Sequence, residues 1–485
     1  MRLKFSKIFL CLIIILTGLL IFNPKPCKAD ETTDSNETAT ALSFTLNDSS
    51  EDTSLVTDSF YKTSVKYYAN TSVNVKSEED MYGIYIMWYH NPSQSYTISY
   101  EDTTIIGGSE GFLHEYIALD TPTKSLDINL TEDMRICEIE VFSKGELPSD
   151  VQVWNPSVDK ADILVFSTHA DDEILFLGGI LACYGSRDDI SVQVAYMCDF
   201  YLSEPYREHE ELDGLWEVGL NIYPVKGNFY DYYCGDYDAA LQIFNYDDVC
   251  AYTTQCIRRF QPLIVVTQDF NGEYGHGAHI LLANAVADAV NNSNNANYHS
   301  ESANEYGCYD VPKTYIHLYN EGSTITLDLR QELETLDNRT ALDALKTAYK
   351  KHVSQQGWWF YVDDEYEYSP ARFGLYRSLV GEDTGNDILE NIKTYETIAN
   401  EEKVGADEAA LNKANDYSNS LVDSVKSIKE ELKEYKTNSL PIKQLIVTLV
   451  AIFIIFFVIL GQAKRHKKEY NKRLNKYKKE NNIKD

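Results

Sequence analysis

The fold is decided by residues 163–173, which read Ile-Leu-Val-Phe-Ser-Thr-His-Ala-Asp-Asp-Glu. The four continuous apolar residues at the start predict a parallel strand that is buried on both faces. A polar turn with one histidine and two aspartates follows, and a helix is expected after it. This order of strand, turn and helix predicts a β-α unit, whose functional groups lie at the carboxyl end of the strand.

The same pattern recurs along the chain. Residues 190–197 and 263–267 predict two more buried strands. Helices are expected after the three strands, over residues 173–184, 206–219 and 276–291. Repeated β-α units imply a parallel sheet with right-handed crossovers. We therefore expect an α/β fold with a Rossmann-like parallel sheet over residues 157–385.

A different pattern precedes this domain. Residues 72–76 and 126–130 alternate polar and apolar side chains, and short runs of this kind separated by polar turns predict a β-sandwich over residues 58–156. The part from Leu126 to Phe142 loosely resembles the closing strands of galactose-binding-like, discoidin-type modules. That resemblance implies carbohydrate binding, and a structural spacer is the alternative.

The two ends of the chain predict a secreted protein that is anchored in a membrane. A basic start, an apolar run and a small residue at Ala29 indicate a signal peptide over residues 1–29. An apolar stretch over 441–462 predicts one transmembrane helix, and the basic tail over 463–485 places the C-terminus in the cytoplasm. The body of the protein is then extracellular.

Two polar segments connect these parts. Residues 30–57 are rich in Thr, Ser, Asp, Glu and Asn, which predicts a flexible spacer. Residues 386–440 are polar and rich in helix-forming residues, which predicts a helical stalk between the domain and the membrane.

Charge and cysteine content narrow the function further. The formal net charge is -32, and an acidic body argues against nucleic-acid binding, which needs a basic surface. Seven cysteines lie beyond the predicted signal peptide, and none of them has the C-x-x-C spacing of a structural zinc site. Buried thiols are the expected state for most of them.

Metal-ligand residue types occur in two predicted strand-to-helix turns. The first turn holds His169, Asp171 and Asp172, and the second, residues 273–279, reads Glu-Tyr-Gly-His-Gly-Ala-His. Two histidines and one aspartate with an open position make a catalytic zinc site. Such a site lowers the pKa of bound water to about 7, and a neighbouring carboxylate can accept the proton.

The two turns, in this order, resemble the PIG-L/LmbE family of zinc-dependent deacetylases that act on N-acetylglucosaminyl substrates. The resemblance covers roughly residues 162–355 and rests on the family motifs His-Pro-Asp-Asp-Glu and His-x-Asp-His. It implies a zinc site of His169, Asp172 and His279, a general base Asp171, His276 beside the tetrahedral intermediate or leaving amine, Tyr274 as an oxyanion donor and Arg207 as a sugar contact. Nitrogen and oxygen ligands also accept other divalent metals.

Further residues match family segments, and two depart from the motifs. Glu210 belongs to an Arg-x-x-Glu helix, and a late segment contains Lys346, His352, Ser354 and Gln355. Ala170 replaces the proline of the first motif, which removes only loop rigidity. Ala278 replaces the aspartate that orients the catalytic histidine, so the role of His276 is open. Asp269 and Glu273 are candidates to supply that carboxylate.

The sequence thus predicts an extracellular, membrane-anchored zinc deacetylase that removes acetyl groups from the N-acetylated amino sugars of a glycan. The alternative motivated by Ala278 is a glycan-binding surface protein whose catalysis is impaired. A zinc amidase for another acyl or peptide substrate is a third reading. Trp358, Trp359 and Phe360 are expected in the core, with stacking on a sugar as their alternative role.

Overall fold

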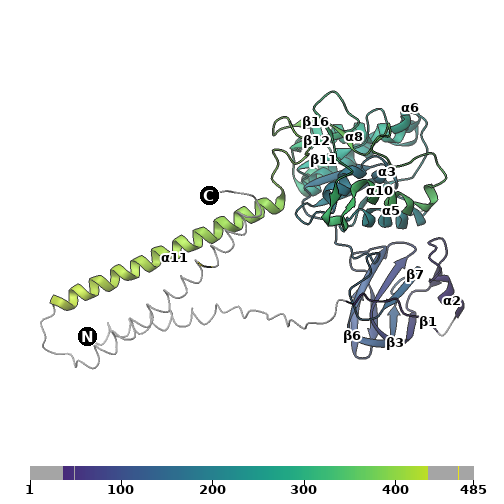
Figure 1. Ribbon diagram of the computed structural model, residues 1–485, viewed down its shortest axis with the longest axis horizontal. Coiled ribbons are helices and arrows are strands. Elements are labelled where there is room, and N and C mark those ends of the chain that lie inside the picture. Colours follow the sequence, from purple (N-terminus) through teal and green to yellow (C-terminus); the bar gives the residue numbers. More distant parts are fainter. Residues whose placement is uncertain (1–36, 48–49, 202, 435–467, 469–485) are drawn as a thin grey trace.

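The computed structural model describes residues 37–47, 50–201, 203–434 and 468 (Figure 1). The signal peptide predicted over 1–29 and the transmembrane helix predicted over 441–462 lie outside these residues, as does the predicted basic tail apart from residue 468. Among the described residues, no helix is both long enough and apolar enough to cross a membrane.

The N-terminal part of the structure is an antiparallel sheet of seven strands in the order β2-β7-β3-β6-β4-β5, with β1 paired to β3. The strands are β1 (Phe44–Leu46), β2 (Val65–Tyr67), β3 (Ser72–Trp88), β4 (Tyr96–Tyr100), β5 (Thr103–Gly107), β6 (His114–Asn129) and β7 (Met134–Phe142). Because β3 and β6 are long and change register along their length, the sheet curls around an apolar core that contains Trp88 and Tyr96.

The structure differs from the predicted sandwich and spacer in two respects. The strands form one curled sheet, because β3 pairs with β6 at both ends instead of dividing between two sheets. The sheet also begins before residue 58, since β1 and the short helix α2 (Ser50–Leu55) lie within the predicted spacer. Leu46 and Val56 are fully buried there, and this apolar packing orders a segment whose overall composition is polar.

The second part is a mixed sheet in the order β10-β9-β8-β11-β12-β16-β13. Its strands are β8 (Ile163–Ser167), β9 (Val192–Cys198), β10 (Val225–Phe229), β11 (Ile264–Thr267), β12 (Lys313–His317), β13 (Thr324–Thr326) and β16 (Arg372–Ser378). The first five strands in the sheet order are parallel, as expected for a Rossmann-like sheet. The antiparallel strands β16 and β13 complete one edge, and the β-α pattern did not predict them.

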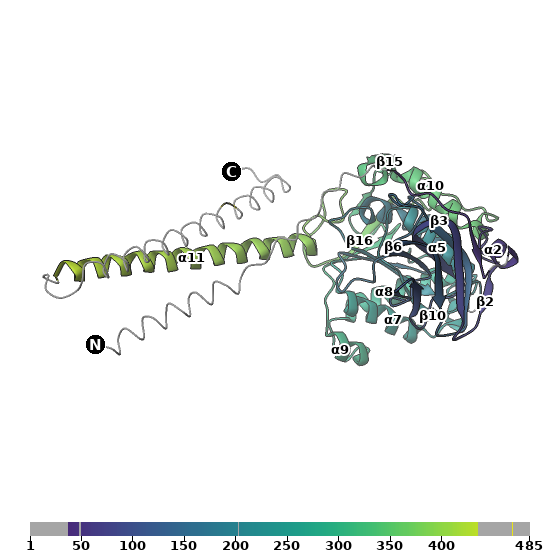
Figure 2. The ribbon, with the colours of Figure 1, turned by 90° about the horizontal axis from the view of Figure 1, so that it is seen from below.

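Helices cover both faces of this sheet (Figures 1 and 2). The α-helices are α3 (Asp172–Leu175), α4 (Gly178–Ile180), α5 (Tyr206–Glu217), α6 (Tyr237–Ile243), α7 (Tyr246–Phe260), α8 (Gly277–Asn292), α9 (Ser300–Tyr306) and α10 (Ala341–Lys351). Shorter elements are η1 (Leu181–Gly185), η2 (Glu273–Gly275), η3 (Glu334–Leu336) and η4 (Val353–Gln355), and a hairpin of β14 (Glu332–Leu333) and β15 (Arg339–Thr340). Val165 packs into one apolar core and Leu164 into the other, which explains the continuous apolar run of β8.

The helix predicted over 173–184 is divided into α3, α4 and η1. A Cβ atom on Gly179 would lie 2.2 Å from the Pro370 carbonyl oxygen, and one on Gly178 would lie 2.4 Å from a methyl group of Leu345. The two glycines of α4 therefore allow this segment to approach its neighbours closely.

A long helix, α11 (Tyr395–Glu434), lies within the predicted stalk and extends away from the α/β domain (Figures 1 and 2). Its first residue is attached to the sheet, because the Tyr395 backbone N–H donates to Asp162 Oδ1 at 2.7 Å.

The two parts meet through buried polar contacts on α5. His114 Nε2 lies 2.6 Å from His209 Nδ1, and Tyr61 donates from its hydroxyl to Asp213 at 2.9 Å. The rings of Tyr61 and His209 are stacked with their centroids 4.2 Å apart. Because α5 also carries Arg207, the N-terminal sheet holds the helix that borders the candidate site.

The stability of this junction is expected to depend on pH. Burial lowers the pKa of His114 from 6.5 to about 4. Between these values the unfolded chain binds a proton that the folded chain excludes, so stability falls as the pH falls. His114→Gln removes this contribution, and the difference in unfolding free energy between wild type and variant should shrink by up to about 3 kcal/mol from pH 7 to pH 4. Denaturant titrations measure it, and a difference that stays constant with pH contradicts the assignment.

Candidate active site

The site lies where the strand order of the parallel sheet reverses. β8 pairs with β9 on one side and with β11 on the other, and all three run in the same direction. The turn after β8 carries His169, and the turn after β11 leads to His279 at the start of α8. Ligands of open α/β sheets bind at such a point, at the carboxyl ends of the strands.

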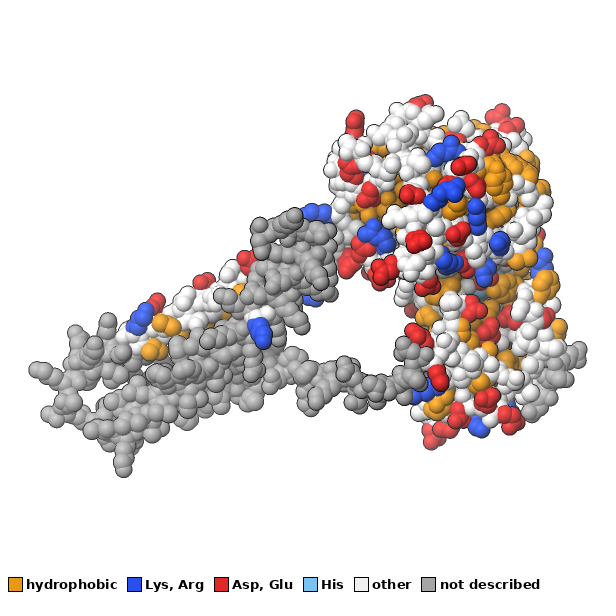
Figure 3. Space-filling model, viewed as in Figure 1, with side chains coloured by type: hydrophobic (Ala, Val, Ile, Leu, Met, Phe, Trp, Pro, Cys, Tyr) orange, Lys and Arg blue, Asp and Glu red, His pale blue; other side chains and the backbone are white. Residues whose placement is uncertain are grey.

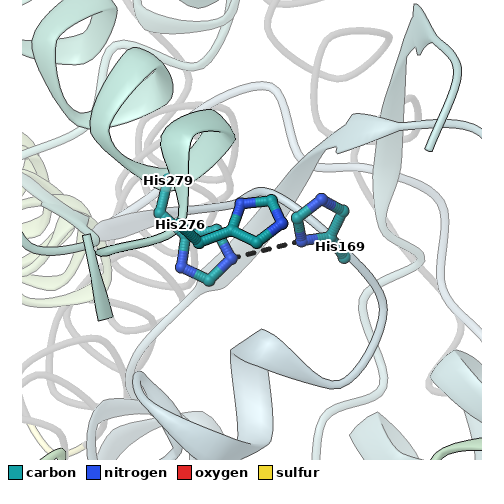
Figure 4. A group of neighbouring side chains, drawn as sticks. All are labelled: His169, His276 and His279. Carbon is teal, nitrogen blue, oxygen red and sulfur yellow. Dashed lines mark hydrogen bonds between the residues drawn. The ribbon is translucent and has the colours of Figure 1, made fainter. Parts of the chain in front are cut away.

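Three possible ligand atoms converge between these turns, and Figure 4 shows two of the side chains that carry them, His169 and His279, together with the neighbouring His276. Asp172 Oδ2 lies 2.8 Å from His169 Nδ1 and 3.0 Å from His279 Nε2, and the two ring nitrogens are 3.3 Å apart. Tetrahedral ligands at the usual zinc distances are separated by about 3.3 Å. The chemistry and spacing of these residues fit a divalent metal, and the assignment of His169, Asp172 and His279 as its ligands stays a prediction.

A second carboxylate orients His279. Glu273 Oε2 lies 2.8 Å from His279 Nδ1, which leaves Nε2 to face Asp172. The other oxygen of Glu273 lies 2.6 Å from His317 Nδ1, and His317 Nε2 lies 3.0 Å from the Ser369 carbonyl oxygen. All these side chains are buried, so Glu273 fixes the ring that a metal would contact.

The charges of this group favour a cation between the carboxylates. Burial opposes ionisation, yet the His279 and His169 rings hold the pKa of Asp172 well below its usual range. Burial lowers the pKa of His279, but Asp172 and Glu273 outweigh it and raise this pKa to about 10. Positive charge is thus stabilised at the place where a metal would be bound.

Two other groups of side chains also have ligand atoms close enough together to hold a metal ion. His276 has a ring nitrogen within 4.8 Å of those of His169 and His279, and His169 forms a similar group with Cys198 and Asp231. His276 Nδ1, however, accepts the Ala278 backbone N–H at 3.2 Å, so the neutral ring carries its proton on Nε2. Burial raises the pKa of the Cys198 thiol. That Asp172 is the third ligand beside His169 and His279 stays a prediction.

Within the described part of the chain, no carboxylate forms a hydrogen bond or ion pair with the His276 ring. Burial and the neighbouring His279 and His169 rings lower the pKa of His276 to about 2, so the ring is neutral near pH 7. Glu273, which the sequence offered as a substitute for the missing aspartate, pairs with His279 instead. Asp269 directs its backbone N–H to Glu273 and its carboxylate to Asn271.

Asp171 sits beside the ligand group in an unusual backbone conformation. Its φ is 115°, a value that side-chain-bearing residues rarely adopt, and its backbone N–H donates to Glu173 at 2.7 Å. Glu173 is held in turn by His352, whose Nε2 lies 3.0 Å from Glu173 Oε1. Burial and the Asp172 carboxylate raise the pKa of Asp171 to about 7, a value suited to a general base. Such strain is often found at functional sites.

Arg207 borders the pocket, but its guanidinium group is already engaged. It donates to Asp231 Oδ2 at 2.6 Å and to the Ala170 carbonyl oxygen at 2.5 Å. Glu210, one turn later, accepts from the backbone N–H and hydroxyl of Ser354 at 2.8 and 2.6 Å. Lys346, by contrast, pairs with Asp363 away from the pocket lining. Sugar contact by Arg207 remains a prediction.

An open pocket of about 660 Å³ leads to the ligand group. It is lined by His169, Asp171, Asp172, Glu204, Tyr206, Arg207, Asp231, Tyr233, Tyr274, His276, Ser354, Gln355, Trp358, Trp359 and Phe360. All the predicted site residues except the buried His279 are on this wall. The expected core position of Trp358 and Trp359 is wrong, because their exposed fractions are 62% and 57%. The two indole rings line the pocket instead of packing in the core.

Two residues of the site, Asp231 and His317, were not predicted from the sequence. Asp231, which lies 3.5 Å from His169 Nε2 and binds Arg207, follows β10 in a tyrosine-rich run. Its position directly after a strand was the available signal. His317 at the end of β12 gives no local signal, because only the fold brings it to Glu273.

The chain has little detectable similarity to known proteins. No family model and no curated protein matches it. Solved structures that it resembles include the conserved protein TT1542 from Thermus thermophilus, with 17% identity over 40% of this chain and 80% of that one and a TM-score of 0.30. An N,N'-diacetylchitobiose deacetylase from Pyrococcus horikoshii has 16% identity over 40% and 71%, with a TM-score of 0.31. A pectin-binding carbohydrate-binding module has 18% identity over 23% and 96%, with a TM-score of 0.17. These scores are too low to support an inference about function.

Metal affinity is expected to depend on Glu273. Glu273→Gln keeps the size of the side chain but removes its negative charge, so the His279 ring becomes less basic and a weaker metal ligand. We expect zinc affinity to fall about 10- to 100-fold, measured by competition with a chelator of known affinity. Glu332→Gln, an exposed residue of β14, is the matched control. Equal affinities of the two variants would contradict the role of Glu273.

Proposed function

We propose that the protein is a metal-dependent deacetylase that removes the acetyl group from N-acetylated amino sugars of a glycan. The observation that carries the proposal is the convergence of Asp172, His169 and His279 beside Asp171, at the floor of an open pocket. Zinc is the metal expected from this ligand set, although other divalent ions suit it as well. An acetamido sugar is proposed as the substrate because the two motifs resemble those of PIG-L/LmbE deacetylases.

Each residue of the site has its own role in the proposed reaction. A bound divalent metal would lower the pKa of a water molecule and polarise the acetamide carbonyl. Asp171, whose pKa lies near 7, accepts the proton of the attacking water. Tyr274 donates from its hydroxyl to the developing oxyanion. Protonated Asp171 then gives this proton to the amide nitrogen as the bond between the carbonyl carbon and the nitrogen breaks, which releases acetate and the free amine. The neutral His276 ring, with its proton on Nε2, donates a hydrogen bond to the tetrahedral intermediate.

The pocket supports a sugar substrate better than a peptide. Its wall combines exposed aromatic rings with charged and hydroxyl groups, such as Trp358 beside Ser354 and Glu204. An aromatic face can stack on the apolar face of a pyranose while polar groups bind its hydroxyls. A peptide amidase would need groups that bind an extended backbone, and acetate release from acylated peptides would favour that third reading.

The terminal segments support the proposed location. The sequence of residues 1–29 has the pattern of a signal peptide, and 441–462 has that of a membrane anchor. The proposed enzyme therefore acts outside the cell, tethered by its C-terminal helix, on cell-surface or external glycans.

Acetate release is expected to require Asp171. We expect the zinc-loaded full chain to release acetate from N-acetylglucosamine oligomers, and Asp171→Asn to lower the rate about 10²- to 10⁴-fold while it keeps its zinc. Asp188→Asn, in the exposed pair Asp188-Asp189, is the matched control. Unchanged turnover by Asp171→Asn would contradict the assigned base.

A specific observation favours one other function. Because Ala278 leaves His276 without a carboxylate, the protein is alternatively a glycan-binding surface protein with impaired catalysis. Full zinc occupancy and glycan binding without acetate release from any N-acetylated oligomer would select this alternative.

A further inference from the structure

Exposed aromatic rings occur on two chain segments that contribute to the lining of the pocket. On the segment after β10, the exposed fractions are 46% for Tyr230, 51% for Tyr232 and 78% for Tyr233. On the segment after α10 they are 62% for Trp358, 57% for Trp359 and 52% for Tyr361. Figure 3 shows patches of hydrophobic side chains at the surface of the α/β domain. We call the six residues Tyr230, Tyr232, Tyr233, Trp358, Trp359 and Tyr361 the aromatic rim.

The aromatic rim is continuous with the site. The Tyr233 ring lies 5.2 Å from the His276 ring, and the Trp359 ring lies 5.9 Å from that of Tyr274. Tyr233, Trp358 and Trp359 line the pocket itself. The other three rings follow them on the same segments but lie outside the pocket lining. The rim therefore begins at the reacting groups and extends beyond them.

These rings remain largely exposed although some of them contact neighbouring rings, as Trp359 does with Phe360. Large aromatic side chains contribute most to stability when they are buried, so their exposure beside a pocket marks a binding surface. The rings offer flat apolar faces, and the tyrosine hydroxyls and indole N–H groups remain in water. A chain of pyranose rings, with apolar faces and polar edges, matches this pattern.

We propose that the aromatic rim binds the sugars next to the one in the pocket, so that the substrate is an oligosaccharide or polysaccharide chain rather than a free monosaccharide. The pocket takes one acetamido sugar, and at least one neighbouring sugar stacks on the rim. This inference rests on the proposed function only for the identity of the central sugar, because stacking on the rim requires no turnover.

Binding measured without turnover tests the proposal. The affinity of the full-length Asp171→Asn chain for N-acetylglucosamine oligomers of two and six units is measured by titration calorimetry. We expect the longer oligomer to bind about tenfold more tightly, the size of one well-formed aromatic contact. Adding Trp359→Ala, or Tyr230→Ala with Tyr232→Ala, should remove most of this difference, and Trp359→Phe should retain part of it.

A matched control and the acetate assay separate the outcomes. Tyr417→Ala removes an exposed tyrosine, with 56% exposure, from α11 far along the chain and should keep the full dependence on length. Equal affinity for both oligomers, or a length dependence that survives the rim variants, overturns the proposal. Length-dependent binding by a wild-type chain that releases no acetate supports the rim and refutes the proposed deacetylase.

Discussion

The Asp172 carboxylate, held between two buried histidines, is the contact on which the rest of the site depends. Two strand ends must meet for it to form, since His169 follows β8 and His279 begins α8 after β11. Burying a carboxylate between two histidine rings destabilises the folded state unless a positive charge compensates the carboxylate. The fold accepts this cost at the switch point of the sheet, where the open pocket reaches the group.

Around this contact, each layer holds the next one in place. Glu273 fixes His279 and is fixed by His317 at the end of β12. Glu173 and His352 hold the turn that contains Asp171. Further out, the N-terminal sheet packs on α5 through the His114–His209 contact. The curled sheet thus contributes to the site indirectly, by positioning the helix that carries Arg207, whether or not it binds a glycan itself.

The sequence predicted the features that depend on residues close together in the chain. The apolar run of β8 and the two polar turns predicted the parallel sheet and the proximity of His169, Asp172 and His279, because each strand is contiguous with the turn that follows it. It failed where long-range contacts decide. The antiparallel strand β16, the close approach of Gly178 and Gly179 to Leu345 and Pro370, and the partnership of Glu273 with His317 all depend on segments far apart in sequence.

Composition misled in two places for the same reason. The polar segment before residue 58 contains only a few apolar residues, but Leu46 and Val56 are enough to attach it to the curled sheet. Trp358 and Trp359 have the hydrophobicity of core residues, yet they lie at the pocket, because a binding surface uses the same side chains as a core. Hydrophobicity alone cannot separate these two uses.

The most direct test of the account is the metal coordination of the zinc-loaded protein, measured by X-ray absorption at the zinc edge. The account predicts a first shell of nitrogen and oxygen alone at about 2.0–2.1 Å, supplied by His169, Asp172 and His279, and its loss in Asp172→Ala. A sulfur contribution at about 2.3 Å would place the metal at Cys198 instead, and the absence of bound zinc would contradict the metal centre altogether.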